Sequence, residues 1–219
     1  MKPLTINLDH YRRLRERMLR HHNALVKTTP RSTFRKCAKR LGLLEGNTLG
    51  VESESELIIL TDYCLYSHRQ RGRNLVEKYL AKLPPADDPD EQGLREAMSN
   101  ARFSLFRVEQ VIRGTGVFVR DLVRGDGLFV VDELLSRTMR QGRLLGGRLV
   151  PFPDYWITTG AGFPVSQETV ALVQAIFLPA LKFTEGDLSQ LRPAADEELA
   201  TVVIGAALQE GTTSDIEYR

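Results

Sequence analysis

The stretch FSLFRVEQVIRGTGVFVRDLVRGDGLFVVD, residues 103–132, decides which fold class this 219-residue chain is expected to adopt. Val, Phe, Leu and Ile recur in short runs that Gly, Asp and Thr separate. This composition predicts short β-strands joined by tight turns. The sequence RGDG at residues 124–127 is typical of a hairpin turn, because Gly and Asp tolerate the backbone angles that such turns require.

Two further extended segments follow, RLLGGRLVPF at residues 143–152 and DYWITTG at residues 154–160. Five short strands in so small a region predict a small antiparallel sheet or partial barrel of SH3-like or OB-like size. Trp156, Tyr155 and Phe152 fit the core of such a barrel. They would also suit a platform on which nucleic-acid bases stack.

The region before residue 101 has the helical period, because its apolar residues recur every three or four positions. Capping boxes are predicted at Ser53–Glu56 and Asp88–Glu91, and Thr29 is a predicted N-cap before Pro30. The predicted helices cover about residues 8–26, 31–41, 54–72, 74–83 and 89–100.

The sequence therefore predicts an α+β fold in three parts. Residues 1–100 form a basic helical region, residues 101–165 form the small antiparallel β domain, and residues 166–219 form an acidic C-terminal helical segment. Its last ten residues, EGTTSDIEYR, are expected to be loose, as chain ends commonly are.

Composition narrows the class of protein further. Hydrophobic residues make up 42% of the chain and charged residues 26%, which are ordinary globular values. No apolar run approaches the ~18 residues that span a bilayer, and the start lacks the apolar core of a signal peptide. Cys37 and Cys64 are too few for a disulfide scaffold. We therefore expect a cytoplasmic protein without a membrane partner, in which both cysteines are buried free thiols.

Charge is distributed unevenly, although the net charge is only +2. Residues 1–44 hold twelve Lys or Arg and two acids, whereas residues 166–219 hold three bases and nine acids. One hypothesis is that the basic helices contact the RNA or DNA backbone without sequence specificity, since Lys and Arg neutralise phosphates. The residues assigned to these contacts are Arg12, Arg13, Arg17, Arg20, Arg31, Arg35, Lys36, Lys39 and Arg40.

Two plainer interpretations use the same charges. The acidic segments can fold back and neutralise the basic helices within one chain. Alternatively, the protein is an interaction or scaffold module whose basic helices meet an acidic protein partner or the acidic C-terminus of a second copy.

Signals for catalysis and cofactors are weak. The chain contains no GxxxxGK[ST] loop, GxSxG elbow, HExxH or paired CxxC motif, so we predict no cofactor, metal or catalytic residue. An enzyme remains an alternative, with an acidic site near the 121–133 hairpin. A metal site of His21, His22 and Cys37 is a weaker alternative. The acids of the hairpin are Asp121, Asp126, Asp132 and Glu133.

The segment from residue 102 to 164 resembles a pattern in uncharacterised bacterial proteins, where it often precedes a SEC-C metal-binding motif. The resemblance implies helices followed by a small barrel, and it implies no reaction. This chain departs from the pattern because no Cys/His cluster follows Cys64, so the SEC-C zinc site is absent. The matching positions are Val119, Arg120, Asp121, Leu122, Ser136, Gly142, Arg148, Pro151, Trp156 and Gly160.

Overall fold

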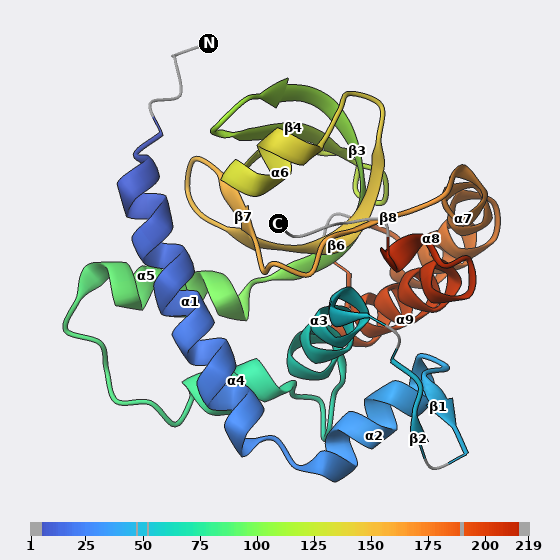
Figure 1. Ribbon diagram of the computed structural model, residues 1–219, viewed down its shortest axis with the longest axis horizontal. Helices are drawn as coiled ribbons and strands as arrows, with labels where there is room; N and C mark the ends of the chain where they lie inside the picture. The colour runs from blue at the N-terminus through green and yellow to red at the C-terminus, as the bar shows by residue number, and fades with distance from the viewer. Residues whose placement is uncertain (1–5, 47, 52, 189–190, 215–219) are drawn as a thin grey trace.

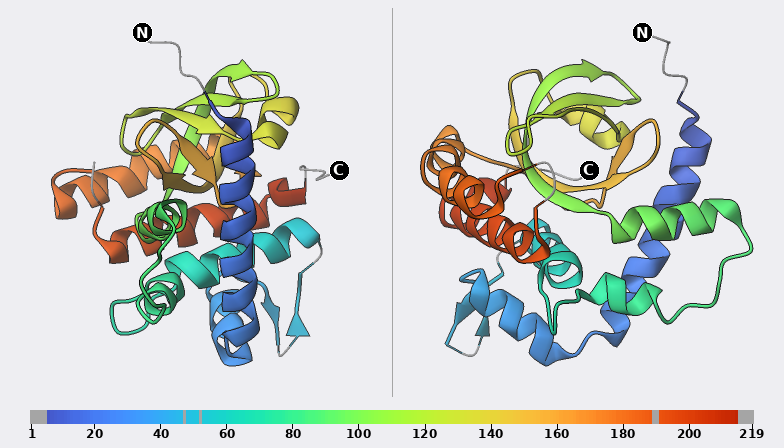
Figure 2. Two further views of the ribbon diagram at one scale, coloured as in Figure 1. Left: turned by 90° about the vertical axis from the view of Figure 1, so that its left-hand side faces the viewer. Right: turned by 180° about the vertical axis from the view of Figure 1, so that it is seen from behind.

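A computed structural model describes residues 6–46, 48–51, 53–188 and 191–214 (Figure 1). It contains a small β-barrel, which the N-terminal helices cover on one side and the C-terminal helices on another (Figures 1 and 2). The predicted α+β class with a small barrel is therefore confirmed. The strands of the main sheet are β3 (Arg102–Ile112), β4 (Gly116–Asp121), β5 (Gly127–Val131), β6 (Leu144–Pro151), β7 (Trp156–Thr158) and β8 (Phe163–Pro164).

Five of these strands close on themselves in the order β3-β4-β5-β7-β6, because β6 also pairs with β3. The long β3 serves both β4 and β6, and a register shift between Val108 and Gln110 marks the bulge that bends it. Helix α6 (Glu133–Thr138) connects β5 to β6. A closed barrel of five strands agrees with the small size that the sequence predicted. Every pairing is antiparallel except that of β5 with β7.

The barrel is filled by the alternate side chains of its strands, including Phe106, Val119 and Val130. Gly116 shows how tightly the strands approach, because a Cβ there would lie 2.1 Å from the carbonyl oxygen of Val130. Trp156 packs against this interior, which favours the core interpretation of that aromatic residue.

The helices before the barrel begin close to where the sequence predicted them. Asn7 caps α1, Ser53 caps α3, and Asn74 forms a full capping box on α4 with Glu77. These helices are α1 (Leu8–Thr28), α2 (Arg31–Arg40), α3 (Glu54–Asp62), α4 (Leu75–Leu80) and α5 (Pro89–Ser99).

Several local predictions were wrong. Thr29 does not cap α2, because its hydroxyl donates back to the carbonyl of Leu25 and Pro30 occupies the N-cap position. The predicted helix 54–72 is α-helical only to Asp62 and ends in a π-helical turn, η1 (Tyr63–Ser67). Helix α6 and a small hairpin of β1 (Leu44–Glu45) and β2 (Thr48–Leu49) were not predicted.

The C-terminal part is helical, as predicted from residue 167. Its tail is more ordered than expected up to residue 214, since Thr213 is completely buried in a short 3₁₀ turn, η3 (Thr212–Ser214). Residues 215–219 of the predicted loose tail lie outside the described residues. The helical elements are α7 (Gln167–Leu172), the π-helical η2 (Val173–Phe177), α8 (Leu178–Glu185) and α9 (Pro193–Gln209).

The three sequence regions share their apolar cores. One core joins α2, α3, β3 and α9, with Cys37, Tyr63, Phe103 and Leu199 among its members. A second core joins α1, η1 and α5 to the outer face of β5, β6 and β7. Both cysteines are free and buried in the first core, which confirms that prediction.

Within the part of the chain that the structure describes, no helix is both long enough and apolar enough to cross a bilayer.

Candidate functional site

Two of the arginines of α1, Arg12 and Arg17, are engaged by acids from other parts of the chain. Arg12 donates to both carboxylate oxygens of Glu133, at 2.8 and 2.9 Å, and Arg17 pairs with Asp88 at 2.5 Å. These arginines hold the pKa of Glu133 and of Asp88 below its usual value. Arg20 pairs within the helix with Glu16, and Arg13 is exposed. Most of the phosphate contacts that the sequence assigned to α1 therefore fall on side chains that already have carboxylate partners.

The cations of α2 are placed differently. Arg31, Arg35, Lys36, Lys39 and Arg40 are all exposed, because the buried face of this helix consists of Thr33, Cys37 and Ala38. Arg40 pairs with Glu197 of α9 at 2.8 Å. Five of the nine residues proposed from the sequence therefore lie together on the exposed face of α2.

The four acids of the 121–133 region do not converge on one site. Asp121 is completely buried and accepts hydrogen bonds from the Ser104 hydroxyl and from two backbone amides, while Asp126 pairs with Arg102. Asp132 caps α6 and accepts from the hydroxyl of Thr158, whereas Glu133 faces Arg12. These roles are structural, so the geometry does not support the acid–base site.

The histidine and cysteine residues are also apart. His21 bonds Glu91 and Tyr79, His22 bonds Tyr66, and Cys37 lies beside Cys64. Among the described residues, no three His, Cys, Asp or Glu side chains are arranged to hold a metal ion. The metal hypothesis built on His21, His22 and Cys37 is therefore wrong.

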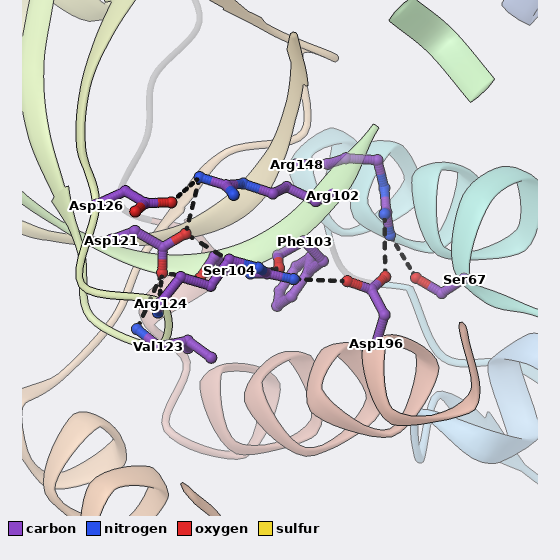
Figure 3. Close-up of polar contacts among 10 residues, drawn as sticks. All are labelled: Ser67, Arg102, Phe103, Ser104, Asp121, Val123, Arg124, Asp126, Arg148 and Asp196. Atoms are coloured by element: carbon purple, nitrogen blue, oxygen red, sulfur yellow. Dashed lines mark hydrogen bonds and ion pairs between the residues drawn. The ribbon is translucent and has the colours of Figure 1, made fainter. Parts of the chain in front are cut away.

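A buried network of charges joins the barrel to the helices (Figure 3). Arg148 of β6 has a side chain only 1% exposed, and it donates to Asp62 at 3.0 Å and to the Ser67 hydroxyl at 2.5 Å. Its guanidinium also lies 3.5 Å from Asp196 of α9 and over the rings of Tyr66 and Phe103. Burial opposes the charge, but the carboxylates raise the pKa of Arg148, so it remains protonated.

Two more arginines complete this network. Arg124 lies between Asp121 and Asp196, and it donates to the carbonyl of Phe103. Arg102 faces Asp121 and Asp126, with its guanidinium 4.4 Å from the Trp156 ring centre. The network thus holds three arginines (Arg102, Arg124, Arg148) against four aspartates (Asp62, Asp121, Asp126, Asp196), and one of these, Asp126, has a side chain 48% exposed to water.

A groove runs between α1, α3 and α6 and ends at the barrel loop of residues 158–162. Its two adjoining hollows have volumes of about 390 and 400 Å³ and share Arg15, Ile58 and Gly160. The side walls carry Leu19 and Val26 from α1 and Leu57 from α3, and Leu134 of α6 stands at the other end. All four of these apolar side chains are exposed.

The deep wall of the groove is polar. Asp62 is 8% exposed, and its Oδ1 atom has no hydrogen-bond partner among the described residues. The hydroxyl of Thr159 is also buried and has no hydrogen-bond partner among the described residues. His22 donates to or accepts from the Tyr66 hydroxyl at 2.7 Å, and burial lowers the pKa of His22 to about 4. This histidine is therefore neutral at pH 7.

Loop geometry fixes the end of the groove. Gly160 has φ +100°, a backbone conformation that favours glycine, and a Cβ there would lie 3.4 Å from the Arg15 guanidinium. Arg15 donates to the carbonyl of Thr158, which ties α1 to this loop. The π-helical turn η1 directly after Asp62 turns Ser67 toward Arg148, and such turns are frequent at functional sites.

Sequence reasoning missed this groove and most of the network. Arg148 and Gly160 were singled out only through a resemblance, Asp121 and Trp156 were singled out for other roles as well, and Asp62 was not singled out. The available signal was the helical spacing that places Arg15, Leu19, His22 and Val26 on one face of α1, but one helix face cannot show which helix lies opposite.

The comparisons with known proteins leave the function open. Neither the search of curated proteins nor the search of solved structures gave a match. The resemblance to proteins that carry a SEC-C motif stays a prediction. A family model described as "Family of unknown function (DUF7986)" matches residues 6–176, a span that includes the barrel and both walls of the groove. Because that match covers most of the 219 residues, the chain belongs to the DUF7986 family of unknown function.

Proposed function

We propose that this protein is a protein-interaction module whose groove between α1, α3 and α6 receives an amphipathic helix of a partner protein. One observation carries the proposal. Among the described residues, four of the eight exposed large hydrophobic side chains line this groove. Apolar side chains gathered in a concave surface with a polar rim are typical of binding sites.

The dimensions of the groove favour a helix as the occupant. The lining residues of α1 extend from Tyr11 to Val26, which is about 22 Å at 1.5 Å per residue. That length accommodates about four turns of a helix, with its apolar residues in the hollows. An extended strand is less suited, because β7, the strand that leads into the groove loop, is already paired with β5 and β6.

A displayed library of amphipathic helical peptides tests the proposal. Leu57→Glu places a charge in the groove wall, and Leu172→Glu on α7 is its matched control, since both leucines are 47% exposed. We expect selected peptides to bind the unaltered protein and the control alike. They should bind Leu57→Glu about tenfold more weakly or worse, since burying an unpaired charge at an interface is costly.

Fluorescence anisotropy of labelled peptides measures these affinities, and circular dichroism checks that both variants fold. Peptides that bind all three proteins equally would contradict the proposal, as would a library that yields no binder. A concentration-dependent dimer that Leu57→Glu abolishes would identify a second copy, rather than a partner protein, as the occupant.

A second candidate function has its own supporting observation. The α2 face carries five exposed Lys or Arg side chains, and the helix contains no acid. We propose that, if the protein contacts RNA or DNA, it does so through this face and not through α1. Phosphate contacts of this kind are independent of sequence and weaken as salt rises.

Anisotropy with a random single strand and a random duplex, across a salt series, tests that candidate. The combined change Arg31→Glu, Lys36→Glu and Lys39→Glu should abolish binding. The combined change Arg13→Glu and Arg20→Glu on α1 should weaken it little. Affinity that does not depend on salt, or that survives the α2 changes, would contradict the candidate.

A further inference from the structure

The deep wall of the groove holds two polar atoms that lack partners. Oδ2 of Asp62 accepts a hydrogen bond from Arg148. Oδ1 of Asp62 and the hydroxyl of Thr159 have no hydrogen-bond partner among the described residues. Both residues line the same hollow. Buried polar atoms are rarely left without partners, because each one loses its bonds to water. Two such atoms in one cavity wall indicate a place where a ligand supplies the missing donor.

Charge determines which kind of donor fits. Asp62 shares its cationic partner, because Arg148 lies between Asp62 at 3.0 Å and Asp196 at 3.5 Å. His22 offers no positive charge, since it is neutral at pH 7. Arg15 of α1 lines the same hollow, but it donates to the carbonyl of Thr158. The Asp62 carboxylate is therefore only partly compensated.

We propose that the helix entering the groove carries one Lys or Arg, and that its cationic head binds Oδ1 of Asp62 and the hydroxyl of Thr159. This inference rests on the proposed function of the groove. The aliphatic stem of such a side chain would lie along Leu57, Leu65 and Ala161, which line the same hollow. Long basic side chains commonly bury their stems in this way while the charged head reaches a polar group.

Small probes test this pocket without knowledge of the partner. The full chain is titrated with n-butylguanidinium, n-butylammonium, n-butanol and n-butyrate, and the backbone amides of Thr159, Gly160 and Asn23 are followed by NMR. We expect both cations to shift these amides with affinities about tenfold higher than butanol, since hydrogen bonds between charged groups are stronger than those to a neutral hydroxyl. Butyrate should not bind.

Variants separate the pocket from general attraction to acids. Asp62→Asn should remove the preference for cations over butanol. Thr159→Val deletes an unpartnered hydroxyl and leaves the Arg148 pair in place, so the protein should fold and bind the cations several-fold more weakly. Glu54→Gln at the mouth of the groove is the matched acid control and should change the affinities less than about twofold.

The outcomes also distinguish this inference from the proposed function. If cations and butanol bind alike, or if Asp62→Asn and Thr159→Val leave the cation preference unchanged, the basic anchor is wrong. The groove itself still stands in that case if library peptides lose affinity for Leu57→Glu. Selected peptides should share a Lys or Arg at one fixed position, and peptides that bind as tightly without one would also overturn the anchor.

Discussion

At the scale of single residues, Asp62 connects the interior of the protein to its surface. Asp62 lines the groove, and one of its carboxylate oxygens belongs to the buried network through Arg148, while the other is buried without a hydrogen-bond partner in the part of the chain that the structure describes. The same residue ends α3 and begins the π-helical turn that places Ser67 against Arg148. A ligand at Asp62 would thus contact the joint between barrel and helices directly.

His22 should make the protein less stable in mild acid. Burial lowers the pKa of His22 to about 4, whereas an unfolded chain takes up this proton near pH 6.5. Between these values the unfolded state binds more protons, so the free energy of unfolding falls as the pH falls. The contribution of His22 is fully present above pH 6.5, and about 3 kcal/mol of it is lost by pH 4.

Urea unfolding at several pH values between 7 and 4 measures this loss. His22→Gln keeps a hydrogen-bonding group for the Tyr66 hydroxyl but does not titrate, so its stability should fall less over the same range. If the free energy of unfolding fell equally with pH in the two proteins, His22 would not be the group that causes this pH dependence.

The two cysteines should be inert in the folded protein. Both are buried, and the neighbouring Cys37 thiol together with burial raises the pKa of Cys64. The thiolate is the reactive form, so a thiol that stays protonated and covered reacts slowly. Neither cysteine should react with a disulfide reagent in native buffer, and both should react in denaturant. Rapid labelling of either residue in the native state would contradict the buried arrangement.

At the scale of elements, α6 is a short helix that depends on one cap. Asp132 accepts from the backbone amide of Leu135 and from the hydroxyl of Thr158, which anchors α6 to the end of β7. Asp132→Ala should lower the free energy of unfolding by about 2 kcal/mol, because it removes a cap and a buried hydrogen bond.

Asp154→Ala is the matched control for α6, since Asp154 is exposed in the turn before β7 and its loss should cost less than about 0.5 kcal/mol. Chemical denaturation gives both values. Equal stabilities of the two variants would mean that the cap is not what holds α6 in place.

At the scale of the whole molecule, Arg148 holds three elements together. It reaches Asp62 at the end of α3 and Asp196 of α9 from a barrel strand. Arg148→Met leaves Asp62 without its charged partner, and removal of one partner from a buried ion pair commonly costs about 3–5 kcal/mol. We expect a loss of that size in urea unfolding.

The double change Arg148→Met with Asp62→Leu removes both charges and should recover much of the lost stability. Arg107→Met on an exposed position of β3 is the control and should be nearly neutral. No recovery in the double variant would show that Asp62 is compensated by another group.

The sequence by itself determined the local structure of most elements. Strands between residues 103 and 160 were predictable from their β-branched and aromatic runs, and the starts of α3, α4 and α5 from Ser53, Asn74 and Asp88. The buried free state of Cys37 and Cys64 was predictable from their number. These properties depend on neighbouring residues along the chain, which a sequence shows directly.

Only the tertiary structure decided which charges meet and where the groove lies. Arg12 and Glu133 are 121 residues apart, and Arg148 lies 86 residues from Asp62. Their pairing depends on how the barrel closes and on which helix covers it, and periodicity carries no information about contacts over such separations. For the same reason the arginines of α1 looked free in sequence, although Asp88, the N-cap of α5, pairs with Arg17 and Glu133 of α6 pairs with Arg12 in the folded protein.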